Sequence, residues 1–372
     1  MRRKISLLLI WSAVILILAG CWDERLLKDV RIVYLTGIDV DEEENFILSS
    51  FVRDLNIGQS SRGERSITNI MTSSKGRNIR EASLHVDRNI AGTFDPAKGR
   101  TVILGKDLAG ENIYQAFDSV FREPRVNINA YVAMTDGTAE DLLTHLSENE
   151  VEKAEFFYEL IDSSEQFTEI PFITLRSLLT LLFDEGKDFF IPYVGIDEEV
   201  NMVSVNGGAH FHQEHFTGEF ISLDESTLLL LFGENIGKQA ILTSPLGNGQ
   251  NDSISYKVKK LTRDMSIEKS DHVHVNISLN LDVEVTDYPP TDLKKEGTAE
   301  RLNKQLSEDL TTKAEILFQK LSANRSDVLG IGRELIAYHP DIWKEIQGDH
   351  YYDNIIIHPE VNFKIIHGGI II

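Results

Sequence analysis

The chain has 372 residues and a formal net charge of −22, with 42% apolar and 26% charged residues. This length allows two or three domains, and the composition is that of a folded protein rather than a disordered one. Such an acidic surface repels phosphates, which argues against a nucleic-acid partner, and it also repels an anionic membrane surface. If the protein lies at a membrane, something other than electrostatics must hold it there.

The first twenty residues predict a lipoprotein signal peptide. A basic stretch, residues 2–4, precedes an apolar run, residues 5–19, which has the length of a signal-peptide core and is short for a bilayer span. The run ends in the four residues of a bacterial lipobox, Leu18, Ala19, Gly20 and Cys21. We expect cleavage before Cys21, with a diacylglycerol on its thiol and an N-acyl chain on its amino group, a stable anchor. The alternative is an ordinary signal anchor with an accidental cysteine.

The first half of the mature chain predicts strands interspersed with helices. Strands are expected over residues 31–39, 46–52, 101–104 and 129–135, and helices over 78–86, 113–121 and 139–146. The acidic run 41–44 is predicted to be a solvated hairpin turn. Composition changes near residue 190, and we place the main domain boundary between about 196 and 207. The predicted units are therefore a signal peptide at 1–20, an N-terminal domain at 21–200 and a C-terminal domain at 205–372.

The second half carries the clearest strand, residues 271–287, in which apolar and polar residues alternate strictly. This pattern predicts a half-buried strand of an antiparallel sheet with one face in water. A helix with a leucine stripe is expected over residues 298–321, followed by a second helix over 332–338 and a last strand over 361–365. A sheet backed by one long helix predicts a multi-domain α+β fold with mixed or antiparallel sheets.

One histidine cluster, His210, His212 and His215, could contribute to a metal site together with Glu214. The cluster lacks any sequence-defined further ligand and any motif such as H-E-x-x-H, so we favour a hydrated strand edge and predict no metal. The chain has no nucleophile elbow, no P-loop and no dinucleotide-binding motif. We therefore predict no catalytic residues.

Three short motifs occur in order along the mature chain. The first runs from Cys21 through Trp22 and Asp23 to the turn expected at Gly37-Ile38-Asp39, and the second is Phe121-Arg122-Glu123-Pro124. The third is residues 326–332, whose marked positions are Asp327, Gly330 and Gly332. Two further marked positions, Pro340 and Trp343, follow this motif. In these motifs the chain resembles the Ger(x)C family of spore germination lipoproteins, the C subunits of nutrient germinant receptors. It departs from the family pattern at Glu123 and at residues 350–352, where the family usually has a further tryptophan.

The third motif also has a physical interpretation. Gly330 and Gly332 permit positive φ values, which predicts a chain break between two helices. Pro340 ends the pattern of the second helix, and Trp343 offers a large buried anchor.

The resemblance implies a non-enzymatic α+β lipoprotein on the outer face of the spore inner membrane, with no cofactor besides the lipid on Cys21. It implies two integral membrane subunits as partners, one of them transporter-like. Two alternatives are a solute-binding lipoprotein of an ABC importer, which normally has two doubly wound lobes, and a lipid-anchored hydrolase.

Overall fold

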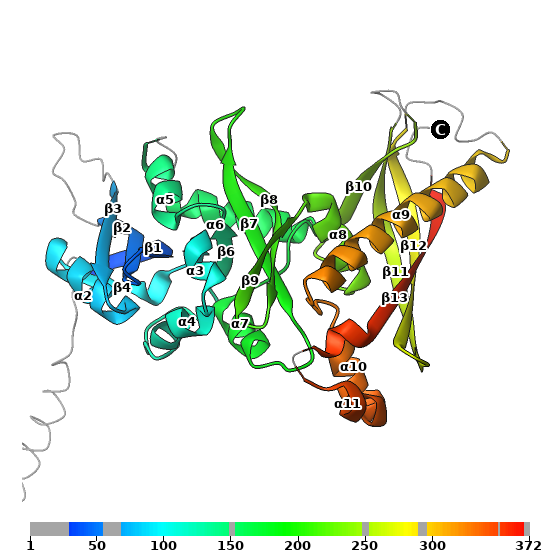
Figure 1. Ribbon diagram of the computed structural model, residues 1–372. Coiled ribbons are helices and arrows are strands. Elements are labelled where there is room, and N and C mark those ends of the chain that lie inside the picture. Colours follow the sequence, from blue (N-terminus) through cyan, green and yellow to red (C-terminus); the bar gives the residue numbers. More distant parts are fainter. Residues whose placement is uncertain are drawn as a thin grey trace, which may run out of the picture.

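The computed structural model describes residues 30–54, 68–148, 153–247, 253–288, 296–348 and 350–367. The lipobox residues Leu18, Ala19, Gly20 and Cys21, and the adjacent Trp22 and Asp23, lie outside these residues. The described chain forms two β-sheets that lie next to each other along the length of the molecule (Figure 1). Both sheets carry helices, so the multi-domain α+β prediction is confirmed.

The first sheet has the strand order β3-β2-β1-β5-β6-β7-β8-β9, with β4 paired to β1. Its central strands β1, β5, β6 and β7 run parallel to one another, and the pairs at either end are antiparallel. The strands are β1 (Val30–Val40), β2 (Phe46–Asp54), β3 (Thr68–Gly76), β4 (Thr93–Asp95), β5 (Thr101–Leu104), β6 (Tyr131–Thr135), β7 (Phe189–Asp197), β8 (Met202–His212) and β9 (His215–Ile221).

Helices cover both faces of this sheet. One face packs against α2 (Ile79–Asn89), α3 (Lys106–Gly110), α4 (Ile113–Phe121) and α7 (Leu175–Leu182), and the other against α5 (Ala139–Glu148) and α6 (Lys153–Gln166). A short 3₁₀ turn, η2, spans Pro96–Lys98. The strand expected over 129–135 forms as β6, but its sequence does not alternate between a buried and an exposed face, because all five residues of β6 are buried. A central parallel strand is covered on both sides and so needs no polar face.

The second sheet has the order β10-β11-β12-β13, and α9 packs along one of its faces (Figure 1). Its strands are β10 (Ala240–Pro245), β11 (Ser253–Lys269), β12 (Val273–Asp287) and β13 (Ile355–His367). Its helices are α8 (Leu223–Phe232), α9 (Thr298–Ala323), α10 (Ile331–Tyr338) and α11 (Pro340–Ile346), followed by the 3₁₀ turn η3 (Tyr351–Asn354).

The long strand and the long helix are both confirmed. The apolar residues of β12 are at most 3% exposed, and they face the leucine stripe of α9 in one core. The antiparallel sheet expected around this strand is wrong for one pair, since β12 is antiparallel to β11 but parallel to β13. The chain returns to the sheet through α9, α10 and α11, and a parallel pair needs a long crossover connection of this kind.

The outer edge of β13 is bonded by side chains of α9. The backbone N–H groups of Val361, Phe363 and Ile365 donate to Thr311 Oγ1, Ser307 Oγ and Asn303 Oδ1, each at 2.9 Å. The acceptors are four residues apart on one face of the helix. The donors are two residues apart, so their N–H groups point to the same edge of the strand. This helix therefore closes an edge that would otherwise be open to another strand.

The first sheet continues through the predicted domain boundary. The connection between β7 and β8 falls within residues 196–207, and β8 pairs antiparallel with β7. The division of the chain at about 200 stays a prediction.

Candidate functional site

The third sequence motif lies at the junction between the two sheets. Residues 326–332 connect α9 to α10 and pack against the segment that leads into β7. The Asp188 N–H donates to the Asp327 carbonyl at 2.9 Å, and the Asp327 N–H donates to Asp188 Oδ2 at 2.7 Å. The Ser326 hydroxyl donates to the carbonyl of Phe211, on β8, at 2.8 Å. The motif therefore attaches the C-terminal helices to the first sheet.

Asp327 is the buried centre of this junction. Its side chain is fully buried and accepts three hydrogen bonds, from the N–H of Ile331 at 2.9 Å, the N–H of Gly332 at 2.7 Å and the Tyr351 hydroxyl at 2.7 Å. The two backbone donors belong to the first turn of α10, whose N-cap residue, a glycine, has no side chain to accept them. Burial raises the pKa of Asp327 to about 6, and the three hydrogen bonds oppose the rise. This carboxyl group therefore caps a helix from inside the protein.

The two motif glycines are needed for different reasons. Gly330 has φ +74°, so its expected left-handed conformation is confirmed. Gly332 does not adopt a positive φ, because it lies in α10, within the helix expected from the sequence. A Cβ at Gly332 would lie 2.8 Å from the Cα of Gly186 and 2.9 Å from the Tyr351 hydroxyl oxygen. Its lack of a side chain allows two backbone segments to touch, and the Arg333 N–H donates to the Gly186 carbonyl at 2.9 Å.

Asp188 is a second buried carboxyl group of the junction, and no pattern in the sequence pointed to it. It is 7% exposed, and its carboxylate accepts from the Gln213 N–H at 2.8 Å and lies 3.1 Å from His212 Nδ1. One side chain thereby contacts the β8–β9 turn and the third motif. The sequence carries no signal for this, because Asp188 meets Asp327 only through the fold.

The three histidines of the sequence cluster are separated. His210 is fully buried beside Thr217, and burial lowers its pKa to about 4, so the expected hydrated edge is wrong there. His212 faces Asp188, and the exposed His215 lies with Nδ1 3.3 Å from the Gly110 carbonyl oxygen. Within the described parts of the chain, no three histidine, cysteine or carboxylate side chains form a group that could hold a metal ion.

Pro340 and Trp343 support the junction from α11. Pro340 occupies the first turn of that helix, directly after the end of α10, as the sequence predicts. Trp343 is half-buried rather than fully buried, and its ring packs edge-on against Tyr351 with centroids 5.0 Å apart. Tyr351 and Tyr352 are 7% and 2% exposed. These tyrosines fill the core where the sequence departs from the family pattern.

The first motif has the same kind of role on β1, an interior strand of the first sheet. Asp39 is 3% exposed, and its two carboxylate oxygens accept from the N–H groups of Ala139 at 2.6 Å and Glu140 at 2.9 Å. Burial raises its pKa to about 6. A Cβ at Gly37 would lie 2.8 Å from Ala139 Cβ. Gly37 and Asp39 are thus part of β1, not of the expected turn. Gly37 leaves space for the first turn of α5, and the Asp39 carboxylate caps that turn.

These contacts hold backbone segments in place, with hydrogen bonds from main-chain donors to buried carboxylates. Among the described residues, none of the helices is long and apolar enough to cross a membrane.

Comparison with known proteins agrees with the order of the motifs. Residues 23–196 match the family model described as the spore germination protein N-terminal domain. Residues 206–369 match the model described as spore germination B3/GerAC like, C-terminal. Together the two matches take in most of the chain.

Individual proteins also align over most of their length. The spore germination protein GerQC of Bacillus cereus is 21% identical over 354 residues, which are 95% of this chain and 96% of that protein. The spore germination protein KC of Bacillus subtilis (strain 168) is 22% identical, covering 93% and 91% of the two chains. The crystal structure of the GerBC protein superposes with a TM-score of 0.58 and 16% identity, covering 92% of this chain and 100% of that one. That structure supports the fold.

Proposed function

Because this chain belongs to the Ger(x)C family of spore germination proteins, we propose that it is the lipid-anchored C subunit of a nutrient germinant receptor. The observation that carries the proposal is the match of both family models, in order, at residues 23–196 and 206–369. The similarity of full-length spore germination proteins supports it.

The proposed anchor is the lipid on Cys21. A basic stretch, an apolar core and the sequence Leu18-Ala19-Gly20-Cys21 occur in the order that lipoprotein processing requires. Two acyl chains on the glycerol give stable membrane binding where a single chain gives only marginal binding. The acidic body, with a formal charge of −22 over the whole chain, would otherwise be repelled by an anionic membrane.

The proposed role is to assemble with two integral membrane subunits on the outer face of the spore inner membrane, without catalysis. In support, the motif residues that the structure describes make structural contacts. Asp39 and Asp327 each cap a helix. Gly37 lets β1 approach Ala139 closely, and Gly332 lets α10 approach the backbone of Gly186. A receptor subunit that must hold a defined shape needs such contacts.

Replacing Cys21 by alanine tests the anchor. We expect the parent chain to incorporate a labelled fatty acid and to sediment with membranes, and Cys21→Ala to remain unlabelled and either soluble or uncleaved. Gly20→Ala is the matched control, since it keeps a small residue before the cysteine and should still be labelled. An unlabelled parent chain would refute the lipid anchor.

A further inference from the structure

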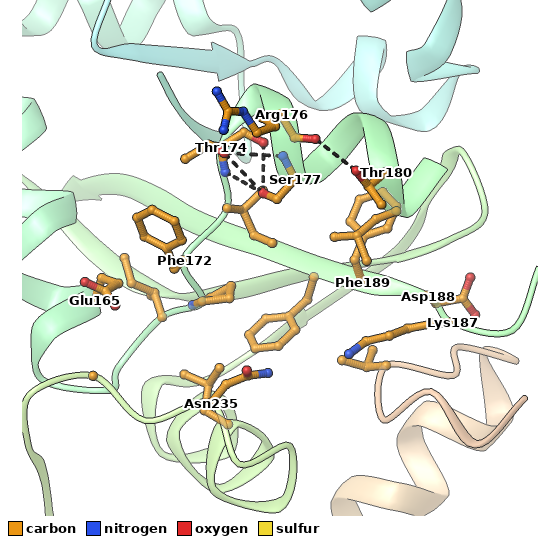
Figure 2. A pocket seen from close by; sticks show the side chains of 18 of the residues that line it. Glu165, Phe172, Thr174, Arg176, Ser177, Thr180, Lys187, Asp188, Phe189 and Asn235 are labelled. Atoms are coloured by element: carbon orange, nitrogen blue, oxygen red, sulfur yellow. Dashed lines mark hydrogen bonds between the residues drawn. The ribbon is translucent and has the colours of Figure 1, made fainter. Parts of the chain in front are cut away.

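A cavity of about 620 Å³ lies beside the junction, between the N-terminal end of β7 and the loop that follows α8 (Figure 2). Its volume is within the range of about 300–1,000 Å³ in which proteins bind whole small molecules. Val328 of the third motif lines it, but none of the marked motif positions does, so the receptor role leaves this site unassigned.

The inner wall of the cavity is apolar and its rim exposes apolar side chains. Phe189, Phe190 and Leu230 line it and are 2–4% exposed. At the rim, Phe172 is 58% exposed and Ile236 is 40% exposed. Large apolar side chains in water around a hollow are a feature of ligand-binding surfaces.

Lys187 supplies a positive charge to this apolar space. Figure 2 shows its side chain extending toward Asn235, while the neighbouring Asp188 side chain points away. Among the described residues, its ammonium has no hydrogen bond or ion pair, although Asp327 and Asp184 act on it at longer range. Its aliphatic stem packs against Gly330, where a Cβ would lie 3.1 Å from Lys187 Cδ. The stem is therefore held while the charge is free to meet a ligand.

The charge of Lys187 is partly desolvated. Burial, and then the nearby Arg333, lower the pKa of its ammonium group. Burying a charge without a partner is unfavourable, so an anion that reaches this ammonium offsets a cost that the protein already bears. Glu165, the other acidic group among the lining residues, lies at the far end of the cavity in Figure 2.

From the cavity, its apolar walls and the unpaired ammonium, we propose that this site binds a small organic anion, a carboxylate carried on an apolar body. Lys187 pairs with the carboxylate, and Phe172 and Ile236 cover the apolar body. The apolar body could be an aromatic ring or an acyl chain, and the same contacts serve both. This proposal does not depend on membership of a receptor complex.

The test is calorimetric titration of the full chain in lipid nanodiscs, with empty nanodiscs as the blank. The probes are 3-phenylpropionate and octanoate, each compared with its matched alcohol, 3-phenylpropanol or octanol. We expect saturable one-to-one binding of at least one carboxylate, with its alcohol about tenfold weaker or more, because a charge-assisted hydrogen bond is lost. Preference for one probe identifies the apolar body.

Variants assign the binding to this cavity. Lys187→Met should weaken carboxylate binding about tenfold or more, and Lys187→Arg should largely retain it. The control is Lys238→Met. Lys238 is an exposed lysine on the loop that follows α8; its ammonium donates to Gln166, and it does not line the cavity. No saturable binding of either carboxylate, equal binding of the matched alcohol, or unchanged binding by Lys187→Met would overturn the proposal. The alcohol comparison on the parent chain decides the matter even if Lys187→Met fails to fold.

Discussion

Replacing Gly332 by alanine adds one methyl group where the C-terminal motif touches the first sheet. The new Cβ would lie 2.8 Å from Gly186 Cα and 2.9 Å from both the Gly186 carbonyl oxygen and the Tyr351 hydroxyl oxygen. Two of these three atoms belong to the backbone, which cannot rotate away as a flexible side chain can. Either α10 moves away from Gly186 or the Tyr351 hydroxyl leaves Asp327.

The expected cost follows from three contributions. Overpacking of a tight contact costs about 1–3 kcal/mol. Weakening the Tyr351 bond to the Asp327 carboxylate adds up to about 1.5–3 kcal/mol. Alanine is favoured over glycine within a helix by up to about 1 kcal/mol, which partly offsets these costs. We therefore expect Gly332→Ala to lower the free energy of unfolding by about 2–4 kcal/mol.

The assay is urea unfolding followed by tryptophan fluorescence, since the Trp343 ring lies 5.0 Å from that of Tyr351 and reports on this packing. The control is Gly110→Ala in α3, where a Cβ would meet nothing within 4 Å and stability should be unchanged or slightly higher. A Gly332→Ala protein as stable as the parent would refute the close-contact role.

Asp39→Ala removes the acceptor for the Ala139 and Glu140 N–H groups, and urea unfolding should show a loss of about 1–3 kcal/mol. Burial raises the folded-state pKa of Asp39 from 3.8 to about 6, so the folded protein binds this proton more tightly than the unfolded chain does. The contribution of Asp39 to the free energy of unfolding therefore increases as the pH falls from about 6 to 3.8, and decreases as the pH rises over the same range. Asp39→Asn should abolish that contribution, and an unchanged pH profile of unfolding would contradict it. Ser307→Ala with Thr311→Ala frees two N–H groups on the β13 edge and should increase self-association on gel filtration, unlike exposed Thr312→Ala.

Much of the fold could be predicted because, in some elements, the order of apolar and polar residues indicates which face is buried. The alternation of β12 and the leucine stripe of α9 each describe one buried face, and the structure places those faces together. The helix at Ile113–Phe121 also ends as predicted, before Pro124. In these elements local periodicity and tertiary burial agree.

The parallel centre of the first sheet could not be predicted in the same way. β5 and β6 are short and buried on both faces, so periodicity says little about their partners. Likewise, whether β13 would run parallel or antiparallel to β12 depends on the crossover, not on the strand.

The site was predictable only where a residue's role is local. Gly330 adopts the expected positive φ because the break between helices is a property of its own backbone. The roles of Asp188, Gly332 and Asp39 depend on partners far along the chain, such as Gly186 for Gly332 and Ala139 for Asp39. No pattern in the surrounding sequence predicts such long-range partners.

Purification of the tagged chain from spore membranes, with identification of the proteins that accompany it, tests the central claim most directly. The account predicts that two integral membrane proteins co-purify with the parent chain in fixed proportion. Recovery of the chain without any integral membrane partner, under conditions in which its own membrane association is preserved, would contradict its assignment as a receptor subunit.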